Sequence, residues 1–340
     1  MTTELPPIVP TDDFWSRRAN AQTHVFECAP YGIPATISSN DEGVLAAARL
    51  SAARYSRSDI QRGRPIRIRC IVADRGPREP IPDDLADRLV YSGLEDWITL
   101  SAGEWGRGFA NLQSREACVF LSPALAHDAR FVSRYFLDHY VLNMVLTEWA
   151  MLHASCAFDV ERQRLIVMVA THNIGKSTTA LRLARAGYAF LADGMALLQR
   201  EGDSLVVGGY PIGEVKLRDD VLAWFPEYRG QAVHAREQQK TIVNLRAAHP
   251  SRIVETLITP ASIHLCFVER HAAPETRVAV THMPEVLPIV AANTAYWNDA
   301  ARLEHNTITL HHLLRIASLH RLYLGSDPDG IIAAVNQLTN

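Results

Sequence analysis

The stretch from Leu165 to Asp193 constrains the fold of this chain more than any other part of the sequence. It begins with a continuous apolar run, Leu165–Val169, which has the length of a buried strand and is too short for a membrane span. After a turn, a helix is expected from Thr178, with Gly187 as its C-terminal stop. The small and aliphatic residues of this helix are Ala180, Leu181, Leu183 and Ala184. Tyr188–Asp193 then predicts a second strand. This order of strand, loop, helix and strand is typical of a phosphate-binding site.

The loop between the strand and the helix fits the pattern G-x-x-x-x-G-K-[ST] everywhere except at its first glycine. Gly175 lets the backbone pass close to a phosphate, Lys176 can reach the β- and γ-phosphates, and the Ser177 hydroxyl can hold Mg²⁺. The phosphates would lie at the N-terminus of the helix, where unpaired N–H groups and the dipole favour anions. We therefore expect a nucleotide to contact Ala170, Thr171, His172, Asn173, Ile174, Gly175, Lys176, Ser177 and Thr178.

Two residues depart from the usual loop and restrict its backbone. Ala170 replaces the first glycine, which is tolerable only if that position does not need a positive φ. Asn173 fills an interior position, and asparagine is the residue after glycine that best tolerates a left-handed conformation. His172 either touches the nucleotide or faces solvent.

Composition limits the class of protein and its partners. The chain has 340 residues, which favours two domains, and its 48% hydrophobic and 21% charged residues predict a soluble globular protein without disorder. A formal net charge of -3 gives no electrostatic case for nucleic acid or for a membrane surface. The five cysteines are widely spaced without a C-x-x-C pair, so we expect buried thiols rather than a zinc site. Together with an N-terminus that lacks signal-peptide features, they indicate a cytoplasmic protein.

The pattern of the remaining chain predicts an α/β protein in two parts. Residues 1–124 predict a mixed, strand-rich domain, with strands near Ala35–Ser38, Ile66–Val72, Trp97–Ser101 and Ala117–Leu121 and a helix in Asp41–Tyr55. Apolar residues at three- to four-residue spacing predict a connecting helix from Leu125 to Leu152. Residues 153–340 form the second domain, with a hairpin around Glu201–Ser204 and a last helix ending near Leu338.

The second domain resembles a known family in the order and spacing of its motifs. These are His153-Ala154-Ser155, the loop ending Gly175-Lys176-Ser177, Gly187-Tyr188 and Leu191-Ala192-Asp193. They are similar to the catalytic domain of the HPr kinase/phosphorylase family and its paralogues, over about residues 145 to 330. The resemblance implies a phosphoenolpyruvate carboxykinase-like fold with a mixed sheet. It also implies ATP, Mg²⁺ and transfer of phosphate to a serine hydroxyl.

The resemblance assigns roles to single residues of this chain. Lys176 and Ser177 match the phosphate- and metal-binding positions. Asp193 matches the first of two consecutive aspartates, which hold the metal and activate the attacking hydroxyl, but the second position is Gly194. There are three alternatives: Asp193 both binds the metal and activates the hydroxyl, or a second acid comes from elsewhere in the chain, or catalysis is weak. The candidates for that second acid are Glu214 and Asp203.

Two further positions follow from the resemblance. His153 corresponds to a family histidine that stabilises charge or shuttles a proton, with a structural role as the alternative. Lys216 stands near the position of a family glutamate and could instead neutralise a phosphate.

The histidines His311, His312 and His320 have no carboxylate or cysteine to complete a metal site, so a solvated helix face is favoured for them. Ser155 has no G-x-S-x-G context for nucleophilic hydrolysis.

These observations lead to an expected function with stated alternatives. The chain is expected to be an ATP- and Mg²⁺-dependent phosphotransferase that acts on a hydroxyl, with serine of a peptide or small protein as the leading acceptor. The N-terminal half would recognise that acceptor, and a homo-oligomer is compatible with the sequence. The alternatives are a catalytically degenerate nucleotide-binding scaffold and a kinase with a small-molecule acceptor.

Overall fold

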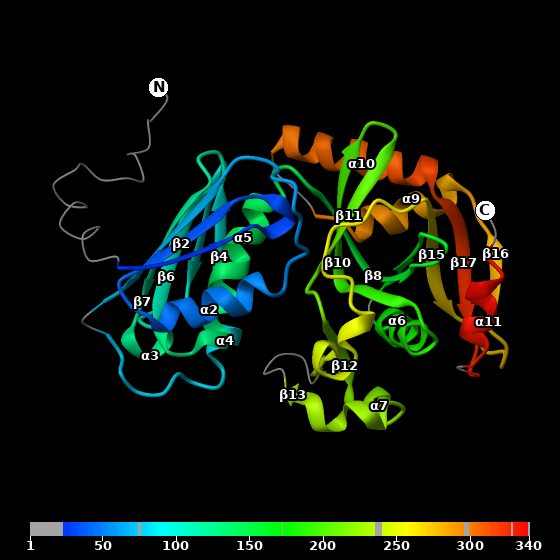
Figure 1. Cartoon of the computed structure of the whole chain (residues 1–340), viewed down its shortest axis with the longest axis horizontal. Coiled ribbons are helices and arrows are strands. Elements are labelled where there is room, and N and C mark those ends of the chain that lie inside the picture. Colours follow the sequence, from blue (N-terminus) through cyan, green and yellow to red (C-terminus); the bar gives the residue numbers. More distant parts are fainter. Residues whose placement is uncertain are drawn as a thin grey trace. The chain divides into compact units, whose positions relative to one another are not determined.

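The structure is a computed structural model that describes residues 23–73, 76–171, 173–234, 240–295, 299–327 and 329–338. The chain divides into two compact units (Figure 1). The first consists of Met1–Ala53 and Asp59–Val145, and the second of Arg54–Ser58 and Leu146–Asn340. Each unit carries its own mixed sheet of seven strands, so the chain belongs to the α/β class, as the sequence predicts.

The first unit is built on a sheet with the order β1-β2-β3-β7-β6-β5-β4. Its strands are β1 (His24–Cys28), β2 (Ala35–Ser39), β3 (Ile66–Val72), β4 (Val90–Leu94), β5 (Trp97–Ser101), β6 (Gly106–Asn111) and β7 (Glu116–Leu121). Its helices are α2 (Gly43–Ala52), α3 (Pro123–Ala126), α4 (Ala129–Phe131) and α5 (Asp138–Val145), with a π-helical turn at Val132–Leu137 and 3-10 turns at Pro30–Gly32 and Leu85–Arg88. The strands and the helix expected in this half are confirmed.

Side chains alternate between the two faces of the sheet over the first five residues of β3. Ile66, Ile68 and Cys70 are buried, whereas Arg67 is exposed and Arg69 is half-buried. A period of two places successive side chains on opposite faces of a sheet. The strand pairs in parallel with a neighbour on each side, β2 and β7, so it is an interior strand of the sheet.

The expected continuous helix from Leu125 to Leu152 is wrong, because it is interrupted near its start and ends early. The helical chain is broken between α3 and α4, because Asp128 accepts a hydrogen bond from the Phe131 N–H and caps a new helix. It ends at Val145, and Ala150 already begins β8 (Ala150–Asp159). Trp149 matches the helical spacing in the sequence, but it lies in the turn between α5 and β8, where it is apolar because it is buried. The helices up to Val145 belong to the first unit rather than forming a separate connection.

The second unit is built on a sheet with the order β11-β10-β8-β9-β15-β17-β16. Its strands are β8, β9 (Arg164–Val169), β10 (Ala189–Glu201), β11 (Ser204–Tyr210), β15 (Ser262–Arg270), β16 (Arg277–Val280) and β17 (Ser318–Leu324), and a small sheet contains β12 (Glu214–Arg218), β14 (Lys240–Asn244) and β13 (Ala232–His234). Its helices are α6 (Lys176–Arg185), α7 (Asp219–Leu222), α8 (Leu245–Ala248), α9 (Met283–Ala292), α10 (Ala300–Ile316) and α11 (Gly330–Asn336), with 3-10 turns at Pro226–Gln231 and Pro250–Arg252. The expected hairpin joins β10 to β11.

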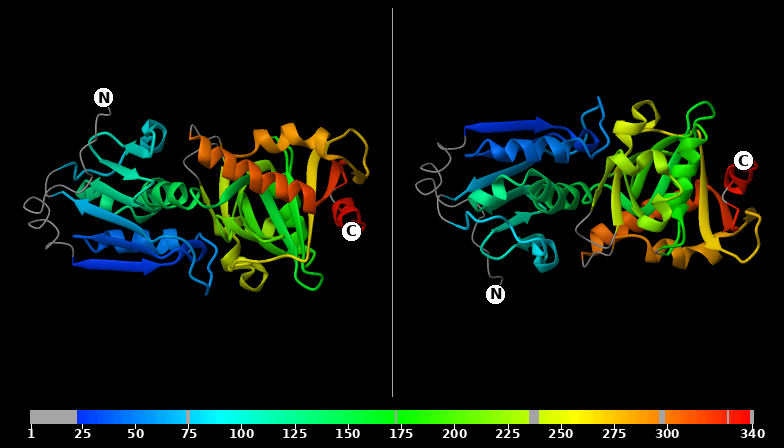
Figure 2. Two further views of the ribbon diagram at one scale, coloured as in Figure 1. Left: turned by 90° about the horizontal axis from the view of Figure 1, so that it is seen from above. Right: turned by 90° about the horizontal axis from the view of Figure 1, so that it is seen from below.

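Helices cover both faces of the large sheet of the second unit. Side chains of α6 and α11 share one hydrophobic core with one face of the central strands. Side chains of α9 and α10 share a second core with the opposite face. Figure 1 shows α6 and α10 on opposite sides of this sheet, and the view from above in Figure 2 shows α10 running across it. The site described below lies on the α6 face.

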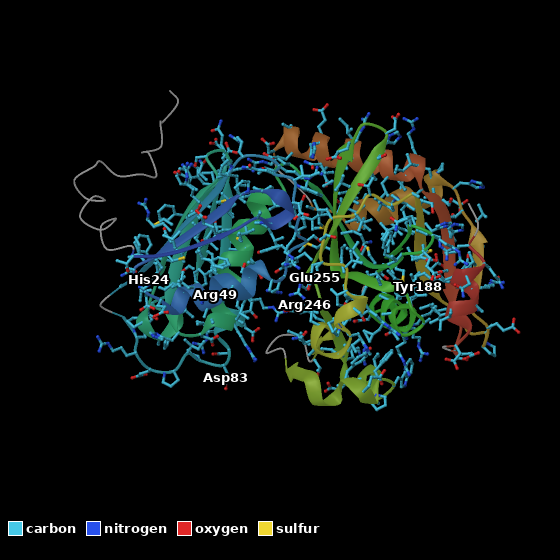
Figure 3. All side chains as sticks on the ribbon, in the orientation of Figure 1. His24, Arg49, Asp83, Tyr188, Arg246 and Glu255 are labelled. Atoms are coloured by element: carbon cyan, nitrogen blue, oxygen red, sulfur yellow. The ribbon has the colours of Figure 1, made fainter. Side chains whose placement is uncertain are left out.

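A short segment from the first half of the sequence completes the second unit. The Ile212 N–H donates to Arg54 O at 2.9 Å, and the Gly209 N–H donates to Ser56 Oγ at 2.8 Å. Arg57 pairs with Glu255, which also lies 3.2 Å from Arg246; Figure 3 labels Arg246 and Glu255. The segment Arg54–Ser58 therefore belongs to the second unit through main-chain and side-chain bonds.

None of the helices in the described part of the chain combines the length and the apolar character needed to cross a membrane.

Candidate functional site

The 170–177 loop leaves the end of β9 and runs directly into α6. β9 is the fourth of the seven strands and is parallel to β15. Crevices at the carboxyl ends of parallel strands are the usual ligand sites of open α/β sheets. The loop thus lies at the same edge of the sheet as the carboxyl ends of the parallel strands β15 and β17, whose side chains can reach it.

The backbone of the loop meets the two restrictions set by its sequence. Asn173 adopts a left-handed conformation with φ 63°, as expected for asparagine, and Gly175 has φ 129°. Ala170 is not among the residues with positive φ, so alanine replaces glycine there without strain. Glycine is needed at position 175 for its conformation, whereas the nearest atom to a Cβ there would be the movable Leu324 Cδ1 at 2.9 Å.

Lys176 lies folded over the loop. Its Nζ donates to Ala170 O at 2.9 Å and lies 3.5 Å from Thr171 O, and the residue is only 8% exposed. The ammonium group is thereby placed at the N-terminus of α6, the end of a helix that attracts anions. Of the other predicted contact residues, Thr171 is exposed, Ile174 and Thr178 are half-buried, and His172 lies outside the described residues.

Asp193 is the centre of the polar contacts in this region. The hydroxyl of Ser177 donates to its Oδ1 at 2.7 Å, and the hydroxyl of Ser155 donates to the same oxygen at 2.5 Å. The Lys216 N–H donates to Oδ2 at 3.2 Å. The carboxylate is 8% exposed, so these donors replace much of the water that an ionised group requires. The structure therefore brings together Lys176, Ser177 and Asp193, as the sequence predicts.

A β-bulge directs Asp193 to the face of the sheet that carries α6. The register between β10 and β8 shifts between Phe190 and Ala192, so that Leu191 is the extra residue. Phe190 packs in the α6 core, whereas Leu191 and Ala192 both pack in the core on the opposite face. Bulges change which face the following side chains occupy. Without the extra residue, simple alternation would turn Asp193 away from Ser177.

His153 shares this face of the sheet. It pairs with Met195 in the same antiparallel register that pairs Ser155 with Asp193, two residues farther along β8. Its N–H donates to Asn293 O at 2.6 Å, and the residue is half-buried. The backbone thus places His153 next in line to the hydroxyl and carboxylate groups, at a position open to solvent.

The two acids named as replacements for a second aspartate have different positions. Glu214 opens β12, two residues before Lys216, and its Oε1 lies 3.2 Å from Arg54 Nε. Asp203 lies at the tip of the β10–β11 hairpin, beyond Glu201, and Glu201 is already roughly 26 Å along β10 from Asp193 at about 3.3 Å per residue. Asp203 as a source of the second acid is therefore wrong, and Glu214 is already paired with an arginine.

Two residues of this site have no site role in the sequence-based prediction. The buried Ser155 could have been found from alternation, because His153, Ser155 and Ala157 occupy one face of β8. Arg270 ends β15, and its Nε donates to Ile174 O at 3.0 Å. Nothing in the sequence relates Arg270 to the loop, since that contact depends on the pairing of β15 with β9.

The oxygen atoms of this cluster suit a hard divalent cation. Ser177 Oγ and the Asp193 carboxylate are both oxygen donors, 2.7 Å apart, and Mg²⁺ usually takes one or two protein ligands with the rest from phosphate and water. Over the described ranges, no group of three or more histidine, cysteine, aspartate or glutamate side chains is placed to hold a metal ion. The residues present thus fit Mg²⁺ that arrives with a nucleotide better than an independent metal centre.

A separate cavity lies at the other end of β10. It has a volume of about 340 Å³ and is lined by Arg200, Asp203, Ile308, His311, His312, Arg315 and Ile316. His312 Nε2 lies 3.1 Å from Asp203 O, which fixes α10 to the hairpin. This cavity belongs to the α10 side of the sheet and does not adjoin the Asp193 cluster.

The cysteines are free thiols outside this site. Cys70, Cys118, Cys156 and Cys266 are buried, as expected, and Cys28 is half-buried. Burial raises the pKa of the Cys118 thiol to about 11 and that of Cys266 to about 12, so the reactive thiolate is disfavoured in both.

The site is thus a strand–loop–helix element on an α/β sheet, with a lysine and a hydroxyl–carboxylate pair at its helix N-terminus. No family model and no curated protein sequence matches the chain. Among solved structures, the chain is similar to the HPr(Ser) kinase/phosphatase from Coxiella burnetii, with 13% identity over 54% of this chain and 91% of that one, and a TM-score of 0.30. Similarity at this level is distant.

Proposed function

We propose that the chain is an ATP- and Mg²⁺-dependent phosphotransferase that moves the γ-phosphate to a hydroxyl group. The observation that carries the proposal is the Ser177–Asp193 pair, a hydroxyl and a carboxylate 2.7 Å apart beside Lys176. In such an arrangement, the loop and its lysine would bind the negatively charged triphosphate, and the hydroxyl–carboxylate pair would bind the metal ion that accompanies it.

Each residue of the loop has a part in binding. The N–H groups at the start of α6 would hold phosphate oxygens, and Lys176 would exchange its bonds to the loop carbonyls for bonds to the β- and γ-phosphates. Ser177 and Asp193 would hold Mg²⁺, which neutralises phosphate charge when it is bound. Lys216 is our candidate for a second positive charge at the nucleotide, a role supported by the bond of its backbone N–H to Asp193.

The acceptor hydroxyl must lose a proton as it attacks. A carboxylate offers about four acceptor positions, and three of those of Asp193 are taken by Ser155, Ser177 and Lys216. One position remains on Oδ2, which can take either Mg²⁺ or the proton of the acceptor hydroxyl. His153, on the same face of the sheet, is our second candidate for the proton acceptor. As the acceptor we propose serine in a peptide or small protein, recognised by the first unit.

The first test is binding. We expect Mg-ATP to raise the melting temperature of the full chain, because a ligand that binds only the folded state stabilises it. Lys176→Ala should abolish this shift, and Arg162→Ala should preserve it, since Arg162 lies in the β8–β9 turn at the other end of β9. If Mg-ATP leaves the melting temperature of the wild-type chain unchanged, there is no nucleotide site at this loop.

The second test is transfer. Full-length protein with γ-labelled ATP should label a peptide, protein or metabolite in an extract of the producing cell, and Asp193→Asn should reduce the label at least a hundredfold. Unchanged labelling by Asp193→Asn contradicts the assignment of Asp193.

A nucleotide-binding scaffold without turnover is the second candidate, and Gly194 favours it. The neighbour of Asp193 has no carboxylate, and a Cβ at this position would lie 3.1 Å from Tyr210 O. Binding of Mg-ATP without transfer to any acceptor would support the scaffold and reject the kinase.

A further inference from the structure

Ser155 has no part in the functions considered so far, but its contact is the shortest that Asp193 makes. It is fully buried in β8, and its Oγ donates to Asp193 Oδ1 at 2.5 Å. The nearby positions of the same strand, Ala154 and Ala157, are filled by alanine. A buried hydroxyl is costly unless it is bonded, so packing alone does not account for serine here.

The two serines divide one oxygen between them. Oδ1 of Asp193 accepts both the Ser155 and the Ser177 hydroxyl, which fills its two acceptor positions. Ser155 comes from β8 beside the strand of Asp193, whereas Ser177 comes from α6 above the sheet. The bond from Ser155 therefore holds the Asp193 carboxylate against the sheet, and the bond from Ser177 joins the same oxygen to α6.

We propose that Ser155 is a positioning residue that holds Asp193 in the orientation in which it accepts the proton of Ser177. This inference rests on the proposed function. With its proton donated to Asp193, Ser177 Oγ keeps its lone pairs free for a metal ion, which is what a hydroxyl ligand requires. Partners that orient a ligating carboxylate usually change metal affinity tenfold to a hundredfold when they are removed.

The test separates metal-dependent from metal-independent binding. Binding of the ATP analogue β,γ-imido-ATP to the full chain is measured by calorimetry with Mg²⁺ and again with EDTA. For Ser155→Ala we expect the affinity gained from Mg²⁺ to fall by about tenfold or more, with the affinity in EDTA unchanged. Lys176→Ala should instead lose affinity under both conditions.

The matched control is Thr179→Val. Thr179 is also fully buried in the second unit, and its Oγ1 finds no hydrogen-bond partner among the described residues. This change removes a hydroxyl of equal burial close to the loop, and the affinity gained from Mg²⁺ should be retained. Because Ser155→Ala could fail to fold, Ser155→Thr and Ser155→Val form a second pair of equal shape, and only the threonine variant should keep the gain.

The outcomes distinguish the inference from the proposed function. No binding of the analogue by the wild-type chain rejects the function and the inference together. Wild-type binding with a full Mg²⁺ gain in Ser155→Ala, or an equal gain in the threonine and valine variants, overturns the inference alone. An equal loss of affinity with Mg²⁺ and with EDTA shows a structural role and also overturns it.

Discussion

At the scale of single residues, Gly194 decides what can stand beside Asp193. Its φ is 156°, and a Cβ there would lie 3.1 Å from Tyr210 O and 3.3 Å from Pro211 Cδ. A side chain at this position would press against the backbone of the neighbouring strand. The backbone at position 194 therefore has a conformation and surroundings that suit glycine and leave little space for an aspartate side chain.

We therefore expect Gly194→Asp to destabilise the second unit without increasing phosphate transfer. Backbone strain of this kind costs about 1–3 kcal/mol, which corresponds to a fall in melting temperature of several degrees. Gly194→Ala is the control for strain without charge and should account for most of that fall. A Gly194→Asp variant that melts like the wild type, or that transfers phosphate faster, would show that the backbone accommodates the side chain.

At the scale of elements, the loop is held by the strand next to its own. β15 is parallel to β9, and it places Arg270 so that Nε bonds the loop carbonyl of Ile174 at 3.0 Å. Leu324 at the end of β17 packs under Gly175. The shape of the loop therefore depends on strands that follow it by many residues in the sequence.

Arg270→Ala is expected to weaken nucleotide binding two- to tenfold, because one hydrogen bond contributes about 0.5–1.5 kcal/mol to the ordered loop. Hydrogen exchange of residues 173–178 should become faster in the same variant. Exchange and affinity that both match the wild type would mean that the loop is ordered without Arg270.

The sequence predicted local features of this site better than features that depend on long-range pairing. The turn from β9 into α6, the left-handed Asn173 and the hairpin after Asp193 follow from residue types and spacing, and the structure confirms them. The helix to Leu152 was wrong because a buried tryptophan in a turn imitates helical spacing. The bulge at Leu191 has no residue signature, although it determines the face on which Asp193 lies.

At the scale of the whole molecule, neither unit is one continuous stretch of sequence. Arg54–Ser58 belongs to the second unit, where the Tyr55 ring stacks on Tyr210 at 5.4 Å between centroids and the Arg57 N–H donates to Glu255 O at 2.8 Å. These contacts reach β11 and the chain between the Pro250–Arg252 turn and β15. Stability of the second unit should therefore depend on residues encoded in the first half.

Tyr55→Ala is expected to cost about 3 kcal/mol, the lower end for loss of a packed aromatic side chain. Hydrogen exchange should lose protection at residues 204–218, in the second unit. Leu50→Ala, an exposed position of α2 in the first unit, is the control and should leave that protection unchanged. Loss of protection confined to the first unit would contradict the assignment of this segment.

The segment Arg54–Ser58 also restricts how such a protein can change through gene rearrangement. A recombination event that moves the coding sequence for residues 146–340 leaves behind the strip that bonds Gly209, Ile212 and Glu255. Transfer of that one stretch of coding sequence would therefore give a second unit that lacks the contacts made by Arg54–Ser58. Descendants that keep it intact should carry both halves of the gene together.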